Sequence, residues 1–168
     1  MNLFDFGYSD ALKEDKPTRK IRLLSLFSGI GAFEKALKNV GIEYELVNYC
    51  EIDKYAAKAY SLIHGDSEDM NLGDVCKVDT SELQDIDLVT YGFPCQDISI
   101  AGRQKGLYDD DGGYTRSGLF FEALRIIKDT QPRIAIAENV KNLMSEAFVE
   151  QYHAVQEGLG GGRIQQLR

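Results

Sequence analysis

The chain has 168 residues, of which 43% are apolar, and carries a formal net charge of −8. This length supports one domain with a hydrophobic core, and the negative charge would repel a phosphate backbone unless a local basic patch or a second polypeptide compensates for it. Three cysteines without a CxxC spacing argue against a disulfide framework and a zinc site, and without a signal peptide or membrane-spanning run we expect a cytoplasmic, metal-free protein that binds no membrane.

Short apolar runs alternate with helix-like patterns along the chain, which predicts an α/β fold with a doubly wound, mostly parallel sheet. Gly41 is expected to end the first helix and Asp53 to cap the second. In chain order we expect a strand at 21–27, a helix at 32–40, a strand at 44–50, a helix at 53–63, a weaker strand near 70–75, a strand at 86–93, a loop at 99–117, a helix at 117–130, a strand at 133–139 and a helix at 145–159.

One domain is therefore expected from residue 21 to residue 159. A polar tail, 1–20, precedes it, and a glycine-rich tail, 160–168, follows it. Ligands of parallel sheets bind at the carboxyl ends of the strands, which we call the carboxyl edge. The unusual residues of this sequence do follow predicted strands, so we expect them to converge there: Gly29, Gly31, Glu51, Asp74, Pro94, Cys95, Glu138 and Asn139.

The turn "LFSGIGAFE" has the pattern of a nucleotide cradle. Gly29 and Gly31 allow a tight turn close to a ligand, and Glu51 follows at the distance of a ribose-binding acid. The third glycine of the dinucleotide fingerprint is replaced by Glu34, which favours an adenosyl group without phosphates over a pyrophosphate. The alternative is a plain structural turn with a solvated Glu51.

The stretch "YGFPCQDIS" places Pro94 and Cys95 directly after a predicted strand. A thiolate in a loop at the carboxyl edge can act as a nucleophile, with Glu138 as its expected partner. His64 and His153 fall in or beside helices and are expected to lie away from this edge. Taken alone, a cysteine here would more often be a small buried apolar residue.

Several motifs together resemble the DNA (cytosine-5-)-methyltransferases, particularly the bacterial restriction-modification enzymes. The motifs are "LLSLFSGIGAFE", "EIDKYA", "GDV", "GFPCQDISIAGRQKGL", "RSGLFFEALRI" and "AENVKNL". The resemblance runs from about Ile21 to Phe148 and implies a Rossmann-like methyltransferase fold that is incomplete at the C-terminus. It also implies transfer of a methyl group from S-adenosylmethionine to carbon 5 of cytosine in DNA.

By this resemblance Cys95 is the nucleophile that adds to carbon 6 of the base, and Glu138 is the acid at ring nitrogen 3, expected to be buried between strands. Reaction on a base in duplex DNA requires that the cytosine be flipped out of the stack. Cofactor contacts are implied for the turn Phe27, Ser28, Gly29, Ile30 and Gly31, on the side of the methionine portion, and for Glu51, Ile52, Asp74, Val75, Phe93, Pro94 and Leu119. Substrate contacts are implied for Gln96, Ser99, Arg103, Gln104, Lys105, Asn139 and Val140.

Family members are much longer than this chain, and their target-recognition domain and closing helix are not found in it. The resemblance therefore also implies a complementary subunit, a truncation or a decayed gene product. Three other interpretations remain open: a tRNA cytosine-5 methyltransferase, a catalytically silent module that binds S-adenosylmethionine, and, third, a NAD-dependent oxidoreductase. The missing third glycine argues against the last of these.

Overall fold

The computed structural model describes residues 19–95 and 115–141, together with Ser145 and His153. Nearly all of both predicted tails, the predicted loop as far as residue 114 and most of the predicted helix at 145–159 lie outside the described residues.

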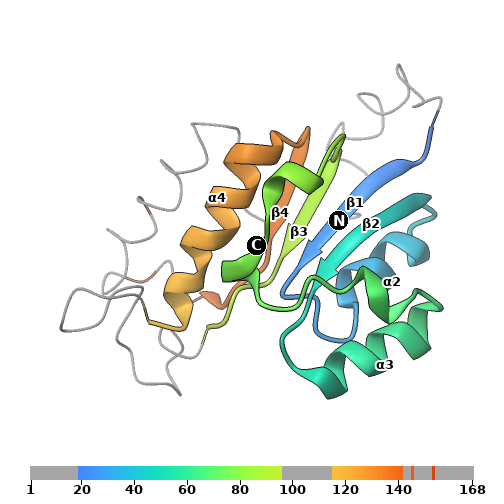
Figure 1. Cartoon of the computed structure of the whole chain (residues 1–168), viewed down its shortest axis with the longest axis horizontal. Helices are drawn as coiled ribbons and strands as arrows, with labels where there is room; N and C mark the ends of the chain where they lie inside the picture. Colours follow the sequence, from blue (N-terminus) through green and yellow to red (C-terminus); the bar gives the residue numbers. More distant parts are fainter. Residues whose placement is uncertain (1–18, 96–114, 142–144, 146–152, 154–168) are drawn as a thin grey trace.

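Four parallel strands form the sheet, in the spatial order β2-β1-β3-β4 (Figure 1). The chain crosses from one side of β1 to the other between β2 and β3, so the order reverses at β1. The strands are β1 (Ile21–Leu26), β2 (Tyr44–Cys50), β3 (Leu88–Tyr91) and β4 (Ile134–Ala137), and the α-helices are α2 (Ala32–Asn39), α3 (Lys54–His64) and α4 (Phe120–Thr130). Every strand and helix predicted within the described residues is confirmed except one.

The exception is the weak strand predicted near 70–75. No strand forms there, and residues 68–82 instead contain three short 3-10 helices, η1 (Glu68–Met70), η2 (Val75–Lys77) and η3 (Thr80–Glu82). Among the described residues, one parallel bridge, between Tyr49 and Asn71, pairs this segment with the sheet. Asp74 caps η2 by accepting from the backbone N–H of Cys76, which favours a tight turn over an extended chain.

Helices cover both faces of the sheet, as the doubly wound prediction requires (Figure 1). Leu24 and Leu26 of β1 pack towards α4 and the η2–η3 segment, in a cluster that includes Val89, Phe93 and Phe120. The alternate residues of the strands pack on the other face, in a cluster that contains Leu23, Leu37, Leu46, Tyr49, Ala57, Tyr60 and Leu88. Successive side chains of a strand point to opposite faces of the sheet, so the strands contribute apolar residues to two separate hydrophobic cores.

The helix ends follow the predicted capping residues. The side chain of Asp53 accepts from the backbone N–H groups of Tyr55 and Ala56 at the start of α3. Gly41 has a φ of +75° just past the end of α2, and its N–H bonds the Lys38 carbonyl at 3.2 Å. Both interactions satisfy backbone groups that a helix end leaves without partners.

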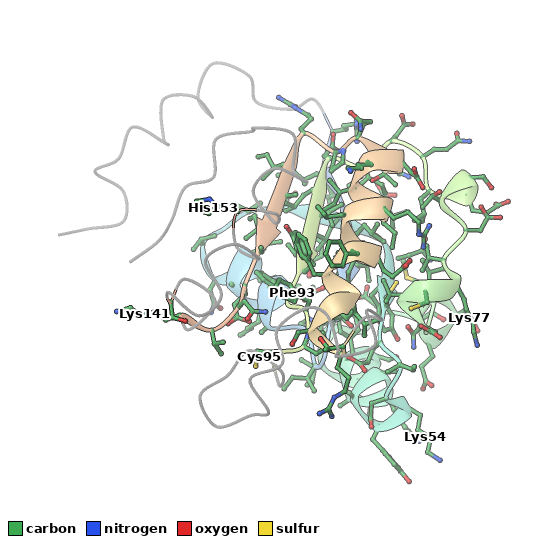
Figure 2. The ribbon with its side chains drawn as sticks, turned by 90° about the vertical axis from the view of Figure 1, so that its left-hand side faces the viewer. Lys54, Lys77, Phe93, Cys95, Lys141 and His153 are labelled. Atoms are coloured by element: carbon green, nitrogen blue, oxygen red, sulfur yellow. The ribbon has the colours of Figure 1, made fainter. Side chains whose placement is uncertain are left out.

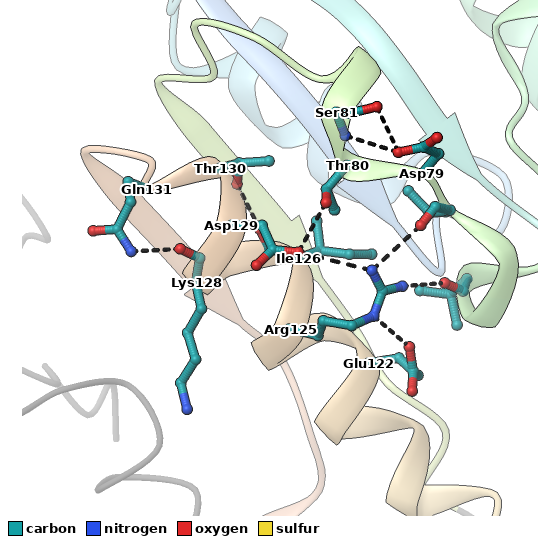
Figure 3. Close-up of polar contacts among 12 residues, drawn as sticks. Asp79, Thr80, Ser81, Glu122, Arg125, Ile126, Lys128, Asp129, Thr130 and Gln131 are labelled. Atoms are coloured by element: carbon teal, nitrogen blue, oxygen red, sulfur yellow. Dashed lines mark hydrogen bonds and ion pairs between the residues drawn. The ribbon is translucent and has the colours of Figure 1, made fainter.

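Arg125 joins α4 to the 3-10 segment (Figure 3). Its guanidinium donates to the backbone carbonyls of Val75 and Val78, each at 3.3 Å, and to the Glu122 carboxylate at 2.9 Å. Nearby, Thr80 donates to Asp129 at 2.8 Å. The part of this segment from Val75 to Thr80 is therefore tied to α4 mainly through one planar, multidentate side chain.

β4 is the outer strand of the sheet among the described residues. All four of its residues are exposed, and Ile134 and Ile136 retain 41% and 39% of their accessible surface. Strands of a parallel sheet are usually buried on both faces, so the apolar side chains of β4 are more exposed to solvent than such strands usually are. Within the described residues, no helix combines the length and the apolar character that crossing a membrane requires.

Candidate active site

A cavity of about 420 Å³ opens at the carboxyl edge, where sequence reasoning expected a ligand. All four strands contribute to its wall through the residues that follow them. The lining residues are Phe27, Cys50, Glu51, Ile52, Gly73, Asp74, Val75, Gly92, Phe93, Pro94, Cys95, Leu119, Glu138, Asn139 and Val140.

The turn after β1 has an unusual backbone. Phe27, Gly29 and Gly31 have φ values of +53°, +56° and +86°. The left-handed region costs little for glycine, but a phenylalanine there is strained, and such strain is typical of functional sites. The turn is fixed to the next strand end, because the Gly29 N–H donates to Oε2 of Glu51 at 2.9 Å.

Glu51 organises the edge of the cavity beside β2. Besides Gly29, its carboxylate accepts from the backbone N–H of Asp53 at 2.7 Å. Its own backbone is held by Asn71, whose side chain accepts from the Glu51 N–H at 3.0 Å and donates to the Glu51 carbonyl at 2.9 Å. Asn71 also accepts from the Gly73 N–H at 2.9 Å.

Sequence reasoning missed this role of Asn71. The signal was an Asn two residues before a glycine in "NLGD", the pattern of an Asx turn. Asn71 does not line the cavity, yet it ties the residue after β2 to the segment that carries Asp74.

Cys95 and Glu138 line the same cavity, from the loops after β3 and β4. The two loops are tied together, because the amide of Asn139 donates to the Phe93 carbonyl at 2.9 Å. The carboxylate of Glu138 lies against the backbone of the loop after β3, since a Cβ at Gly92 would be 3.4 Å from its Oε2, an ordinary contact distance. Cys95 is half-buried and lies past the end of β3 (Figure 2), so its thiol is not part of the core.

One expectation about this pair is wrong. Glu138 is exposed, not buried between strands. The reason is the position of β4, which has a neighbouring strand on one side only among the described residues. Glu138 follows directly on this open strand, so nothing described covers its outer side.

The charges around the cavity are acidic. Glu51, Asp74 and Glu138 line it, and no described lining residue is basic. Lys54 and Lys77 extend outward at the side of the molecule away from Cys95 (Figure 2). Burial and, to a smaller extent, the charges of Asp74 and Glu51 together raise the pKa of the Cys50 thiol to about 12, so this lining cysteine stays protonated at neutral pH. In the described part of the chain, no group of three or more His, Cys, Asp or Glu side chains is placed to hold a metal ion.

Several predicted site residues lie elsewhere. Ser28, Gly29, Ile30 and Gly31 stand beside the cavity and do not line it, whereas every other predicted cofactor residue does. Gln96, Ser99, Arg103, Gln104 and Lys105 lie outside the described residues. The expectation that His64 lies away from this region is wrong: its Nε2 is 3.0 Å from the carbonyl oxygen of Ile30.

A second hollow of about 500 Å³ offers no comparable chemistry. It is more open and is lined by Lys20, Lys38, Gly41, Ile42, Glu43, Tyr44, Leu46 and Asp66, which carry charges of both signs and no thiol. The cavity at the carboxyl edge is therefore the candidate active site.

Among solved structures, that of S. pombe Dnmt2 methyltransferase resembles the chain with a TM-score of 0.61 at 24% identity, over 84% of this chain and 41% of that chain. At this identity the likeness establishes the fold. Residues 21–158 match the family model of the C-5 cytosine-specific DNA methylases. The chain belongs to this family.

Two relatives show how much of a C-5 cytosine-specific DNA methylase is present. The orphan methyltransferase M.Rho11sI of Bacillus phage rho11s is 49% identical over 142 residues, which cover 78% of this chain and 27% of the relative. The type II methyltransferase M.HhaI of Haemophilus parahaemolyticus is 38% identical over 132 residues, which cover 79% of this chain and 37% of the relative. The chain thus spans about a third of the length of these methylases.

Proposed function

We propose that this chain binds S-adenosylmethionine and supplies the nucleophile for methyl transfer to carbon 5 of cytosine in DNA. The observation that carries the proposal is a single cavity that is lined by Cys95 and Glu138, after β3 and β4, by Glu51, after β2, and by Asp74, at the start of η2. A thiol, an acid and a site for an adenosyl group are the three parts that this reaction needs.

The lining suits this cofactor. The apolar side chains of Ile52, Val75 and Phe93 line the cavity and would hold an adenine ring, and the carboxylate of Glu51 would accept hydrogen bonds from the ribose hydroxyls. Among the described lining residues three are acidic and none is basic, which favours a ligand with a positive charge and no phosphate over a dinucleotide. When bound, S-adenosylmethionine supplies an electrophilic methyl group on a cationic sulfur.

The chain's own residues carry the activation of the base. The thiolate of Cys95 adds to carbon 6 of the cytosine, and the electron pair of the 5,6 double bond moves towards carbon 5 and ring nitrogen 3. Glu138 holds a proton at nitrogen 3 and accepts from the exocyclic amine. After methylation, loss of the carbon 5 proton and departure of the Cys95 sulfur restore the double bond.

We propose that the active site needs a second, complementary stretch of polypeptide for catalysis. The matched relatives are about three times as long as the matched region, and β4 exposes apolar side chains at the outer edge of the described sheet. A complementary polypeptide that carries target recognition would cover this strand and bring basic groups to a chain with a net charge of −8. Substrate contacts on this chain are assigned to Gln96, Ser99, Arg103, Gln104, Lys105, Asn139 and Val140.

Duplex DNA with 5-fluorocytosine tests the chemistry, because fluorine at carbon 5 blocks the last proton loss and traps the cysteine adduct. The purified chain is mixed with S-adenosylmethionine and this DNA, with and without the remaining portion of the 49%-identical phage relative as a second polypeptide. We expect an adduct on Cys95, found by mass spectrometry, only in the complemented mixture.

Matched variants separate the roles. Cys95→Ser abolishes the adduct, and Glu138→Gln slows its formation by on the order of 100-fold while S-adenosylmethionine still binds. An adduct formed by the Cys95→Ser variant would refute the assigned nucleophile. If the chain binds S-adenosylmethionine but forms no adduct with any complementing polypeptide, it is a silent binding module. An adduct with RNA and none with DNA would identify an RNA substrate.

A further inference from the structure

A buried polar cluster lies behind the turn after β1, on the face covered by α2 and α3. The hydroxyl of Tyr60 donates to Oε1 of Glu34 at 2.9 Å, and both side chains are fully buried. The Tyr60 ring stacks on Tyr49, with 4.1 Å between ring centres, and contacts His64 at 4.7 Å. None of these residues lines the candidate active site.

His64 connects this cluster to the turn. Its Nε2 lies 3.0 Å from the carbonyl oxygen of Ile30, and its Nδ1 lies 3.4 Å from Nζ of Lys38. A lysine ammonium can only donate, so Nδ1 accepts the bond. The ring proton of the neutral imidazole is then on Nε2, and it is donated to Ile30. Two neighbours together select one tautomer.

The His64 ring packs directly against Gly31, where only a glycine leaves room for it. A Cβ added at Gly31 would lie 2.1 Å from Nε2 of His64, and the residue has a φ of +86°. No side chain fits there while the imidazole keeps its place. The contact also reaches the candidate active site, because Ile30 follows Gly29, whose N–H donates to Glu51 at 2.9 Å.

We propose that His64 is a positioning residue for the cofactor: it holds the Phe27–Gly31 turn so that Gly29 meets Glu51 and the turn can receive the amino-acid portion of the adenosyl ligand. This inference rests on the proposed function. The Glu34–Tyr60 pair fixes the aromatic surface against which His64 stands, and Lys38 fixes its tautomer. Without the Nε2–H donor, the carbonyl of Ile30 loses its partner and the turn loosens.

Two measurements on the ligand-free chain test the geometry. Nitrogen NMR of the His64 ring is expected to report the neutral Nε2–H tautomer at pH 8. Amide hydrogen exchange at Gly29 and Gly31 is expected to speed up by on the order of 5- to 10-fold in His64→Leu, the effect of one lost hydrogen bond. His64→Gln, whose amide can donate to Ile30, keeps nearly the original rates. Leu62→Gln, at a position of the same helix that is 77% exposed, is the matched control and leaves them unchanged.

A pair of ligands then locates the effect. S-adenosylhomocysteine carries the amino-acid portion, and 5′-methylthioadenosine lacks it. We expect His64→Leu to weaken the binding of S-adenosylhomocysteine by on the order of 5- to 10-fold and to leave the binding of 5′-methylthioadenosine unchanged. His64→Gln is expected to bind both ligands as tightly as the original chain does.

The outcomes are distinguishable. If the original chain binds neither ligand, the cofactor assignment of the proposed function fails, while the tautomer and the exchange rates still decide the part played by His64. An Nδ1–H tautomer, unchanged exchange in His64→Leu, or an equal loss for both ligands would each overturn the inference.

Discussion

Cys50 and Cys95 line the same cavity but differ in their surroundings. Cys50 is 1% exposed, and burial raises its pKa to about 12, whereas Cys95 is half-buried. Because the thiolate is the reactive form, a raised pKa slows alkylation at any pH below it. We expect iodoacetamide at pH 8 to label Cys95 and leave Cys50 unmodified in the native chain, as peptide mass spectrometry would show. Labelling of Cys50 at the same rate in native and urea-unfolded chain would contradict this.

Asn71 is expected to contribute more to stability than its partial exposure suggests. Asn71→Ala leaves the N–H groups of Glu51 and Gly73 and the carbonyl of Glu51 without their partners. The expected loss in the free energy of unfolding is about 2–3 kcal/mol, measured by urea denaturation. Asn48→Ala is the control, since Asn48 donates one bond, to the Met70 carbonyl, and its loss is expected to cost about 1 kcal/mol. Equal losses in the two variants would mean that Asn71 does not act as the link.

The sequence predicted which side chains gather at the carboxyl edge better than it predicted the groups that support them. Cys95 and Glu138 were recognisable because each follows an apolar strand, and the structure brings both to one cavity. The Glu34–Tyr60 pair and His64 were not recognisable. Helical periodicity assigns a residue to a face, but it does not say that a buried acid meets a tyrosine 26 positions later.

At the level of elements, the segment from Glu68 to Glu82 depends on a neighbour for its conformation. Its three 3-10 turns have one bridge to the sheet, and Arg125 of α4 supplies bonds to two of its carbonyls. The prediction of a strand near 70–75 was wrong because the apolar residues there are too few and too interrupted to form a ladder, with Asn71 and Gly73 favouring turns.

Arg125→Lys therefore tests whether the fork geometry matters as well as the charge. A lysine keeps the positive charge but cannot bond two carbonyls and Glu122 together. We expect a loss of about 1–3 kcal/mol in unfolding free energy and a several-fold weaker binding of 5′-methylthioadenosine, because Asp74 and Val75 line the cavity. Lys128→Gln, on the exposed side of α4, is the control. A lysine variant as stable as the original chain would show that charge alone suffices.

For the whole molecule, the parallel sheet and the coverage of both of its faces followed from the alternation of strands and helices. The exposed edge at β4 was expected only from the shortness of the chain relative to the family that it resembles, because "IAIA" itself has the composition of a buried parallel strand. Composition reports that a strand is suited to burial, and only the fold reveals whether a neighbour covers it.

An uncovered apolar strand is expected to drive self-association. In sedimentation velocity, the sedimentation coefficient should rise with concentration, and Ile136→Lys should lower the degree of association by placing a charge on the strand. Tyr55→Lys, a change of the same kind at an exposed apolar residue away from β4, should not. If the chain sediments as a monomer even at high concentration, β4 does not drive self-association.

Stability is expected to fall in alkaline solution. Burial raises the pKa of Cys50 from 9.0 to about 12 and that of Tyr91 from 10.0 to about 12. From about pH 9 for Cys50 and about pH 10 for Tyr91, up to about pH 12, the unfolded chain has lost these protons while the folded chain still holds them. The free energy of unfolding then falls as pH rises, by about 1.4 kcal/mol per pH unit for each group. Thermal melts from pH 8 to 11 should show this decline, and Cys50→Ala should make it shallower. A flat profile would contradict the burial of these groups.

Because Phe27, Glu51, Phe93 and Glu138 come from the ends of four different strands, the pocket exists only once all four are aligned. Binding of a ligand in the pocket therefore reports that all four strands are folded and aligned, because the pocket is not formed when any one of them is missing. A molecule that binds in the pocket stabilises the folded state of the entire sheet. At a concentration of a hundred times its dissociation constant, it raises the free energy of unfolding by about 2.7 kcal/mol. A ligand at one edge would thereby guard the far side of the molecule against proteolysis.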